Sequence, residues 1–149
     1  MHSRNSPLRL ATVESAVRAA LEVAERNGVG VCVAIVDDRG HDVMVVRDRA
    51  IWFTAGAARA KAATSALLGM PTSSFAELAN EYPDLLPLIQ SQVRESITTL
   101  PGGVPLTVGG EVVGGIGVSG ATPDQDAEYA QVGAEHFVRA QRSDTPVSG

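Results

Sequence analysis

Apolar residues recur every three or four positions along residues 10–27, with charged and polar residues on the opposite side. This spacing predicts an amphipathic helix that ends at Gly28, because glycine readily adopts the left-handed conformation of a helix C-terminus. Residues 29–36 form an almost continuous run of small and β-branched apolar residues, typical of a strand covered on both faces. A polar turn at 37–40 then leads into a valine-rich strand over 41–47, so we expect a hairpin.

The rest of the chain continues with helices and a second hairpin. An alanine-rich segment predicts a helix with Thr54 as its N-cap, and the pair Gly109-Gly110 suits the tight turn between two strands. In chain order, the pattern predicts helices over 54–68, 75–80 and 83–93, strands over 104–108 and 111–118, and a helix over 122–139. Strands joined by hairpins and helices grouped between them indicate an α+β fold with an antiparallel sheet flanked by helices.

Composition and charge narrow the class of protein. A chain of 149 residues, 44% of them hydrophobic, fits one globular domain, which we expect over 10–140 between a flexible N-terminus at 1–9 and a flexible tail at 141–149. The net charge of -5 argues against nucleic acid as a partner, since that requires a basic patch. No apolar run reaches the ~20 residues that cross a membrane. Cys32, the single cysteine, permits no intrachain disulfide, so we expect a cytoplasmic protein.

A glycine-rich stretch at 114–120 leads into the last helix, where backbone amides attract anions. Its spacing matches neither the Walker pattern nor the Rossmann fingerprint. Ser119 lies in Gly-Val-Ser-Gly, which is not the G-x-S-x-G of a nucleophile elbow. Two interpretations stay open: the glycines let a strand pass close to a helix or to a second subunit, or they line a wall for a flat ligand.

The titratable residues are dispersed. The three histidines do not form a recognisable metal signature. His41 follows a turn, where it either binds a ligand or caps a strand. Turn formation explains Asp37 and its neighbour without a catalytic carboxylate pair. Arg59 and Lys61 interrupt the alanine-rich helix, where they either hold an anionic ligand or lie on an exposed face.

Several short motifs, taken in order, resemble those of one family. They are Val33-Ala34-Ile35-Val36-Asp37 with Gly40-His41, Ala60-Lys61-Ala62-Ala63-Thr64 with Pro71-Thr72, Gly102-Gly103-Val104-Pro105, and Gly114-Gly115-Ile116-Gly117-Val118-Ser119-Gly120 with Asp126. Over about residues 10–137 the chain resembles the GlcG/HbpS-like family, which also includes the C-terminal domain of PduO-type cobalamin adenosyltransferases. The resemblance implies a sheet of about five strands, assembly into homodimers or larger homo-oligomers, and haem binding, which is reported for several members. Residues 96–100 are the expected fifth strand.

Departures from the family pattern bear on the haem hypothesis. The first helix contains no histidine, and the frequent Asp-Gly-Ala of the family reads Asp48-Arg49-Ala50 here. The bulky Ile51-Trp52-Phe53 that follows is either an apolar wall for a flat ligand or a subunit contact. By chemistry alone, Cys32 and His41 are the candidate axial ligands of a haem iron.

The sequence therefore supports two hypotheses. The first is a haem- or tetrapyrrole-binding protein with an accessory or sensing role, and the second is a metal-free enzyme or binding protein for a small organic acid in a glycine-lined pocket. Under both hypotheses the chain associates with copies of itself and binds a small molecule. The sequence does not decide whether the protein is an enzyme. The predicted ligand-binding residues are Asp37, His41, Trp52, Arg59, Lys61, Gly102, Gly103, Gly117 and Ser119.

Overall fold

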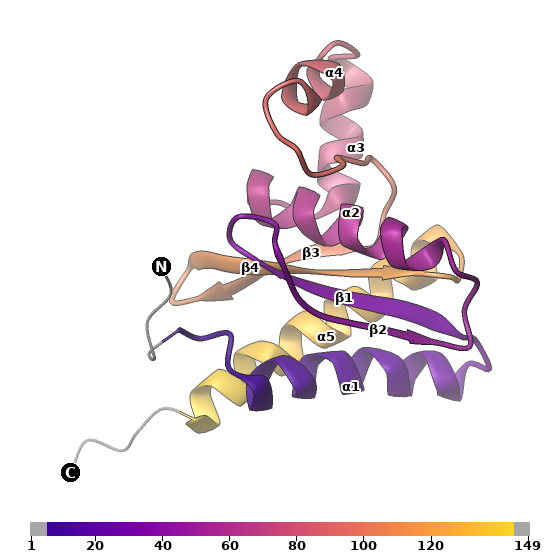
Figure 1. Ribbon diagram of the computed structural model, residues 1–149, viewed down its shortest axis with the longest axis vertical. Coiled ribbons are helices and arrows are strands. Elements are labelled where there is room, and N and C mark those ends of the chain that lie inside the picture. Colours follow the sequence, from indigo (N-terminus) through magenta and orange to yellow (C-terminus); the bar gives the residue numbers. More distant parts are fainter. Residues whose placement is uncertain (1–5, 145–149) are drawn as a thin grey trace.

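The structure is a computed structural model that describes residues 6–144 (Figure 1). Its helices and strands follow the predicted order closely. They are α1 (Leu10–Arg26), β1 (Val31–Asp37), β2 (Asp42–Asp48), α2 (Thr54–Leu68), α3 (Thr72–Glu81), α4 (Leu85–Gln90), β3 (Gly103–Val108), β4 (Glu111–Ser119) and α5 (Pro123–Asp144).

The described strands form one antiparallel sheet in the order β2-β1-β4-β3. The two hairpins meet at its centre, where Cys32 of β1 pairs with Ser119 of β4, and Asp37 pairs with Gly114. The strands with the longest buried runs, β1 and β4, occupy the two central places, where both faces of a sheet are covered. The predicted α+β class with an antiparallel sheet is confirmed.

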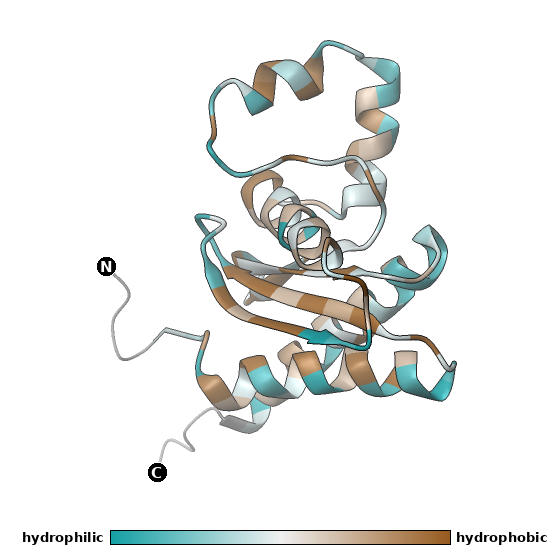
Figure 2. Ribbon diagram, turned by 45° about the vertical axis from the view of Figure 1, so that its right-hand side comes forward, coloured by the Kyte–Doolittle hydropathy of each residue, from teal (hydrophilic) through white to brown (hydrophobic). Residues whose placement is uncertain are grey.

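Helices cover both faces of this sheet. Helices α1 and α5 pack together on one face and α2 packs on the other (Figure 1). Because side chains alternate along a strand, Val33 and Ile35 face the α1 and α5 layer, while Ala34 and Val36 face α2. Figure 2 shows these hydrophobic strands between the helical layers. The first interface contains bulky side chains, whereas the α2 interface is built mainly from alanines.

Glycines in β4 explain how closely α2 lies on the sheet. A Cβ atom on Gly117 would collide with the carbonyl oxygen of Ala58, and one on Gly115 with the carbonyl oxygen of Ala62. Since only glycine avoids these collisions, the central part of the glycine-rich stretch serves the close approach of a strand to a helix. This is one of the two interpretations that the sequence left open.

The expected fifth strand over 96–100 is wrong. This segment pairs with side chains instead of with a neighbouring strand: the Ile97 N–H donates to Gln90 Oε1 at 2.8 Å, and the Thr98 N–H donates to Thr64 Oγ1 at 3.0 Å. The backbone donors that a strand would use are therefore taken, and the described sheet has four strands.

Two further details differ from expectation at the helix ends. Helix α5 continues to Asp144, so residues 141–144 are helical and not part of a tail. The remaining positions predicted to be flexible, 1–5 and 145–149, lie outside the described residues. Thr54 does not cap α2, because its hydroxyl donates to the Ile51 carbonyl at 2.6 Å. Thr122 does cap α5, exchanging hydrogen bonds with Gln125 in a capping box.

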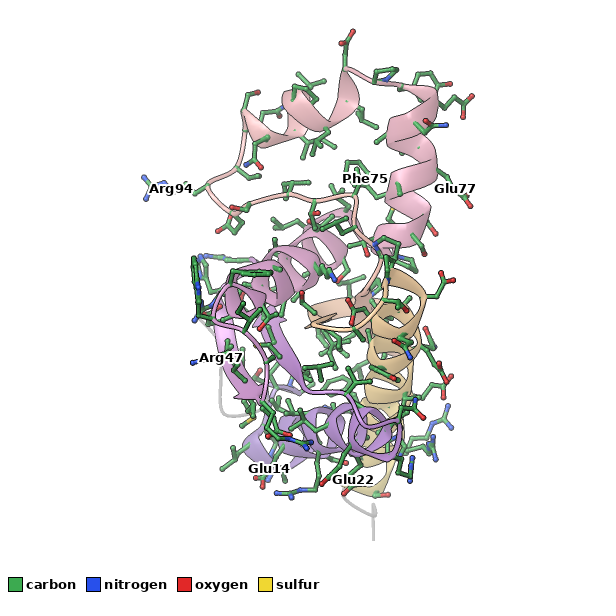
Figure 3. The ribbon with its side chains drawn as sticks, turned by 90° about the vertical axis from the view of Figure 1, so that its right-hand side faces the viewer. Glu14, Glu22, Arg47, Phe75, Glu77 and Arg94 are labelled. Carbon is green, nitrogen blue, oxygen red and sulfur yellow. The ribbon has the colours of Figure 1, made fainter. Side chains whose placement is uncertain are left out.

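Residues 72–97, which we call the arm, comprise α3, α4 and the segment that returns to the body. The arm projects beyond α2, away from the sheet (Figure 1). In Figure 3, Phe75 points into the arm and Glu77 points away from it. Across the described residues, no helix combines the length and the apolar composition that crossing a bilayer requires.

Candidate functional site

A cavity of about 320 Å³ opens where the start of α2 meets the turn between β4 and α5. We call it the α2–α5 cavity. Lys61 and Asp126 contribute its charged groups, and Ser119 and Thr54 contribute hydroxyls. Ser119 is the last residue of β4, and Asp126 lies in the first turn of α5, which begins with the Thr122–Gln125 capping box. This cavity contains two of the predicted ligand-binding residues, Lys61 and Ser119.

Lys61 lies at the inner end of the cavity, and its side chain is almost completely buried. Its Nζ donates to the Val118 carbonyl at 2.9 Å and to Asp126 Oδ2 at 3.0 Å. Asp126 Oδ1 in turn accepts the Ala121 N–H at 3.0 Å, so this carboxylate is fixed at both oxygens. An ammonium group has three protons, and none of the other described residues accepts the third. Lys61 therefore has one N–H to offer to a ligand.

Three exposed apolar side chains, Ile51, Phe53 and Leu100, line the cavity, and Trp52 lies beside them against Phe53 without lining it. The exposed fractions are 57% for Ile51, 75% for Trp52, 54% for Phe53 and 54% for Leu100. The Trp52 and Phe53 rings pack edge to face, with centroids 5.9 Å apart and planes at 86°. We call these four residues the apolar rim. A contiguous apolar patch of this kind on a water-facing surface indicates a binding site for a ligand or a protein.

Asp37 and His41 lie elsewhere, at the turn between β1 and β2. Asp37 Oδ1 accepts the N–H groups of Arg39 and His41 at 2.9 and 3.0 Å. The His41 ring lies between two carboxylates, 3.9 Å from Asp37 Oδ2 and 3.8 Å from Glu95 Oε1. No cluster of three metal-ligating side chains occurs among the described residues, at this turn or elsewhere.

The remaining predicted residues have other surroundings. Arg59 donates to Asp42 Oδ2 at 2.9 Å on an exposed face. Gly102 and Gly103 pack against Lys61, the first on its side chain and the second on its backbone, so they make room for the buried lysine. Gly117 contacts α2 and does not line the cavity.

Cys32 is buried between β1 and α2, away from solvent. Burial raises the pKa of its thiol above the ordinary value of 9.0, although Arg59 and Arg47 partly oppose the shift. A thiol that stays protonated is a poor metal ligand, because the thiolate is the ligating form.

Asp126 is a residue of this candidate site that the sequence pattern does not single out. It follows the glycine-rich stretch in one of the family-like motifs, but the sequence alone gives it no role. The available signal was an acidic residue in the first turn of a helix that directly follows the glycine-rich turn. Its partner on another helix, 65 positions earlier, is visible only in the fold.

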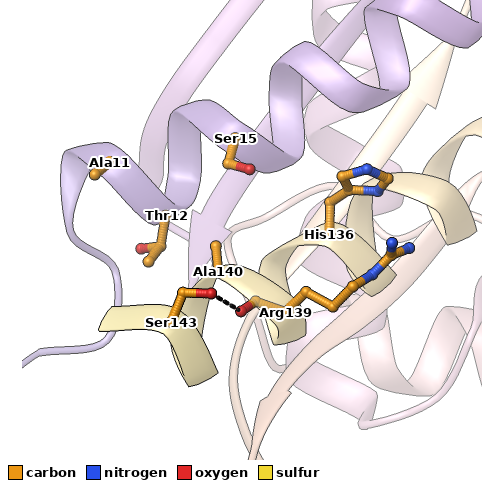
Figure 4. Close-up of a pocket in the computed structure, with 7 residues that line it drawn as sticks. All are labelled: Ala11, Thr12, Ser15, His136, Arg139, Ala140 and Ser143. Carbon is orange, nitrogen blue, oxygen red and sulfur yellow. Dashed lines mark hydrogen bonds between the residues drawn. The ribbon is translucent and has the colours of Figure 1, made fainter. Parts of the chain in front are cut away.

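A second cavity, of about 440 Å³, lies between α1 and the last turns of α5 (Figure 4). His136 and Arg139 line it together with Ser15 and Ser143. The His136 Nδ1 lies 3.0 Å from the Val132 carbonyl, and the Ser143 hydroxyl donates to the Arg139 carbonyl at 3.2 Å. This cavity is larger but contains none of the predicted ligand-binding residues and no large exposed apolar wall.

The four-stranded sheet between two helical layers, with a cavity at one end of α2, defines a small antiparallel α+β domain. A family model described as "Haem degrading protein HbpS-like" matches residues 8–135, so the chain belongs to the HbpS-like family. It is 34% identical over 104 residues to Protein GlcG of Escherichia coli, a match that covers 69% of this chain and 74% of GlcG.

Solved structures give the same result. The crystal structure of HbpS has a TM-score of 0.78 and 35% identity, and the match covers 90% of this chain and 92% of HbpS. The crystal structure of a PduOC–haem complex has a TM-score of 0.75 and 26% identity, with 86% of this chain and 93% of PduOC covered. The recognised family resemblance is confirmed, and the family includes haem-binding proteins.

Proposed function

We propose that this chain binds a tetrapyrrole, with the flat ring against the apolar rim and one edge in the α2–α5 cavity. The observation that carries the proposal is the rim itself, an exposed aromatic and aliphatic patch around the mouth of a cavity that ends at Lys61. A tetrapyrrole has apolar faces and carboxylates at its edge. The rim suits the faces, and the free N–H of Lys61 suits a carboxylate.

The size of the cavity limits how the ring is held. Ligand cavities typically measure about 300–1,000 Å³, and this one lies at the small end of that range. Only an edge of a macrocycle enters, so most of the ring rests on the rim. The residue with the largest exposed fraction there, Trp52, offers the broadest surface for it.

The residues present do not fit the iron of a haem. Common axial ligands are His, Cys, Met and Tyr side chains, and none of these lines the α2–α5 cavity. Of the predicted ligands, Cys32 is buried with a raised thiol pKa, and His41 lies at the β1–β2 turn between two carboxylates. The proposed contacts are therefore with the ring and its carboxylates and not with the iron. Such binding suits a protein that carries or senses the tetrapyrrole.

Parallel titrations with hemin and with metal-free protoporphyrin IX test this proposal. Trp52 is the single tryptophan, so quenching of its fluorescence reports occupancy of the rim in both titrations. We expect saturable binding of both compounds at roughly micromolar concentration, with similar affinities. Absence of saturation with either compound would overturn the proposal, and a strong preference for hemin would show that the chain does ligate iron.

A small organic acid is the second candidate ligand, because the cavity volume is large enough to enclose a small molecule entirely. Its carboxylate would accept the free N–H of Lys61, while the Lys61–Asp126 pair leaves the site without net charge. A thermal-shift screen of small acids tests this candidate. An acid at about 100 times its dissociation constant adds about 2.7 kcal/mol of stability, and Lys61→Met abolishes that gain.

Self-association and a cytoplasmic location accompany the proposed function. The exposed rim favours association of chains in the absence of ligand. The single buried cysteine is compatible with a reducing compartment. Mass measurement in solution tests the first of these, and cell fractionation tests the second.

A further inference from the structure

Ser119 carries a buried hydroxyl that has no hydrogen-bond partner among the described residues. Only 8% of the residue is exposed. Buried polar groups are normally paired, and across the described residues no fully enclosed side-chain oxygen or nitrogen lacks a partner. The Ser119 hydroxyl is therefore not fully enclosed by protein, and it opens into the α2–α5 cavity, which Ser119 lines.

The geometry of β4 directs this side chain toward α2. Gly115 and Gly117 precede it on the strand, and both face carbonyl groups of α2. Because side chains alternate between the two faces of a strand, Ser119 lies on the same face as these glycines. Its pairing partner on β1, Cys32, also packs against α2. The hydroxyl therefore points to the space at the start of α2, where the cavity lies.

The free N–H of Lys61 lies at the same end of the cavity. Lys61 Nζ donates to the carbonyl of Val118, which belongs to the peptide unit that leads into Ser119. The two side chains are not hydrogen-bonded to each other, so each has one proton to donate to a ligand. Two neighbouring donors of this kind match the two oxygens of a carboxylate.

The charges around this end of the cavity favour a singly charged anion. Helix α2 begins here with Thr54 and has no acidic residue in its first turn, so the positive end of its dipole faces the cavity. The N–H groups of Thr54 and Ala55 already donate to the preceding turn, so α2 acts through its dipole and not through direct hydrogen bonds. Asp126 neutralises Lys61 at 3.0 Å, and its carboxylate repels a second negative charge on a ligand.

We propose that Ser119 and Lys61 together hold one carboxylate of the ligand, and that Ser119 is the residue that makes this cavity specific for carboxylates. The inference rests on the proposed function where it assigns that carboxylate to the edge of a tetrapyrrole. A free carboxylic acid presents the same group and binds in the same way. A dianion such as inorganic phosphate is disfavoured by Asp126.

Paired titrations with protoporphyrin IX and its dimethyl ester test the role of Ser119, with Trp52 fluorescence as the signal and one detergent-containing buffer for both. The ester retains the ring but has no charged carboxylate. We expect the wild type to bind the acid at least about tenfold more tightly than the ester, because hydrogen bonds to a charged group are the stronger ones. In Ser119→Ala the affinity for the acid falls by about tenfold, while the affinity for the ester is unchanged.

Ser65→Ala is the matched control. Ser65 is also a buried serine in contact with the sheet, but its hydroxyl donates to the Ala62 carbonyl at 2.9 Å and it does not line the cavity. We expect this variant to keep both affinities, and far-ultraviolet circular dichroism checks that each variant is folded. A purely structural serine would weaken acid and ester alike. Equal losses for the two compounds in Ser119→Ala, or an undiminished affinity for the acid, would overturn the role of Ser119.

Thermal-shift measurements with benzoate and with inorganic phosphate separate this inference from the proposed function. Benzoate is a free carboxylate on a flat ring. At about 10 mM, above the roughly millimolar dissociation constant expected of so small a ligand, we expect benzoate to stabilise the wild type but not Ser119→Ala, and phosphate to stabilise neither. Equal stabilisation by phosphate would overturn the assignment of a carboxylate. If the wild type binds neither protoporphyrin IX nor its ester, the proposed function fails, while the response to benzoate still decides the role of Ser119.

Discussion

At Lys61 a positive charge is held inside the protein by one carboxylate and one backbone carbonyl. Burying an ion pair costs much of the solvation energy of both ions, so such a pair contributes little net stability. Removing one partner is different, because the other charge is then left buried without compensation. The pair joins α2 to the start of α5 across the end of β4, and the shape of the cavity depends on it.

Lys61→Met therefore lowers the free energy of unfolding by about 3–5 kcal/mol, measured by urea denaturation. Lys61→Met combined with Asp126→Leu recovers much of this loss, because no buried charge remains. Arg59→Met is the control, since its ion pair with Asp42 is exposed and contributes at most about 1 kcal/mol. Equal losses for the two single variants would contradict the structural role given to Lys61.

The buried thiol of Cys32 predicts a pH dependence of stability. Its pKa is raised in the folded protein, so above the ordinary value of 9.0 the native state binds more protons than the unfolded chain. The contribution of this thiol to the free energy of unfolding is fully present below that pH. It falls as pH rises, by at most about 1.4 kcal/mol per pH unit. In Cys32→Ala the decline between pH 8 and pH 10 is less steep. Parallel slopes in both proteins would contradict the raised pKa.

The sequence identified some site residues and not others, for a physical reason. Lys61 and Ser119 were found through their motifs, and both line the cavity. Asp37 and His41 come from an equally suggestive motif, but their turn follows the end of β1, whereas the cavity residue Ser119 pairs with Cys32 at the start of β1. Which end of a strand meets which end of a helix depends on packing between distant segments, and spacing along the chain does not contain it.

At the scale of elements, local pattern was sufficient for the helices and strands. The stop of α2 at Gly69, with φ of 69°, follows from the conformational freedom of glycine. The close contact of α2 with β4 also has a local cause, since Gly115 and Gly117 lack side chains where the helix crosses.

Two glycine substitutions test this account. Gly117→Ala destabilises the protein by about 1–3 kcal/mol, because the added methyl group collides with the Ala58 carbonyl. Gly56→Ala, in an α2 position with open space around it, stabilises by about 0.5–1 kcal/mol through the better helix propensity of alanine. Thermal unfolding monitored by circular dichroism measures both. The account requires the midpoint of thermal unfolding to fall in Gly117→Ala and to rise in Gly56→Ala. An unchanged midpoint in Gly117→Ala would contradict the close contact.

The fifth strand shows where local pattern was insufficient. Residues 97–100, Ile-Thr-Thr-Leu, have strand propensity, but Gln90 of α4 and Thr64 of α2 accept the N–H groups of Ile97 and Thr98. Propensity reports how well a residue fits a strand. It does not report whether an unpaired strand edge lies within reach.

At the scale of the molecule, the apolar rim and the arm both expose large apolar side chains to water, which is unfavourable. Trp52→Ala tests the rim as the ligand surface. Its loss removes the largest exposed aromatic face, so we expect the affinity for hemin to fall by about tenfold or more. Val108→Ala, at an exposed apolar site on β3 that is not part of the rim, leaves the affinity unchanged. Absorbance titration in the Soret region measures both. An unchanged affinity in Trp52→Ala would place the ligand elsewhere.

The sequence by itself determined the α+β class, the order of the elements and the family, because these depend on periodicity, turn chemistry and short motifs. Only the tertiary structure decided that Lys61 pairs with Asp126, that the glycines of β4 serve a helix contact, and that the arm stands apart from the body. Each of these depends on contacts between residues far apart in the chain, whose geometry is set when the helices pack on the sheet.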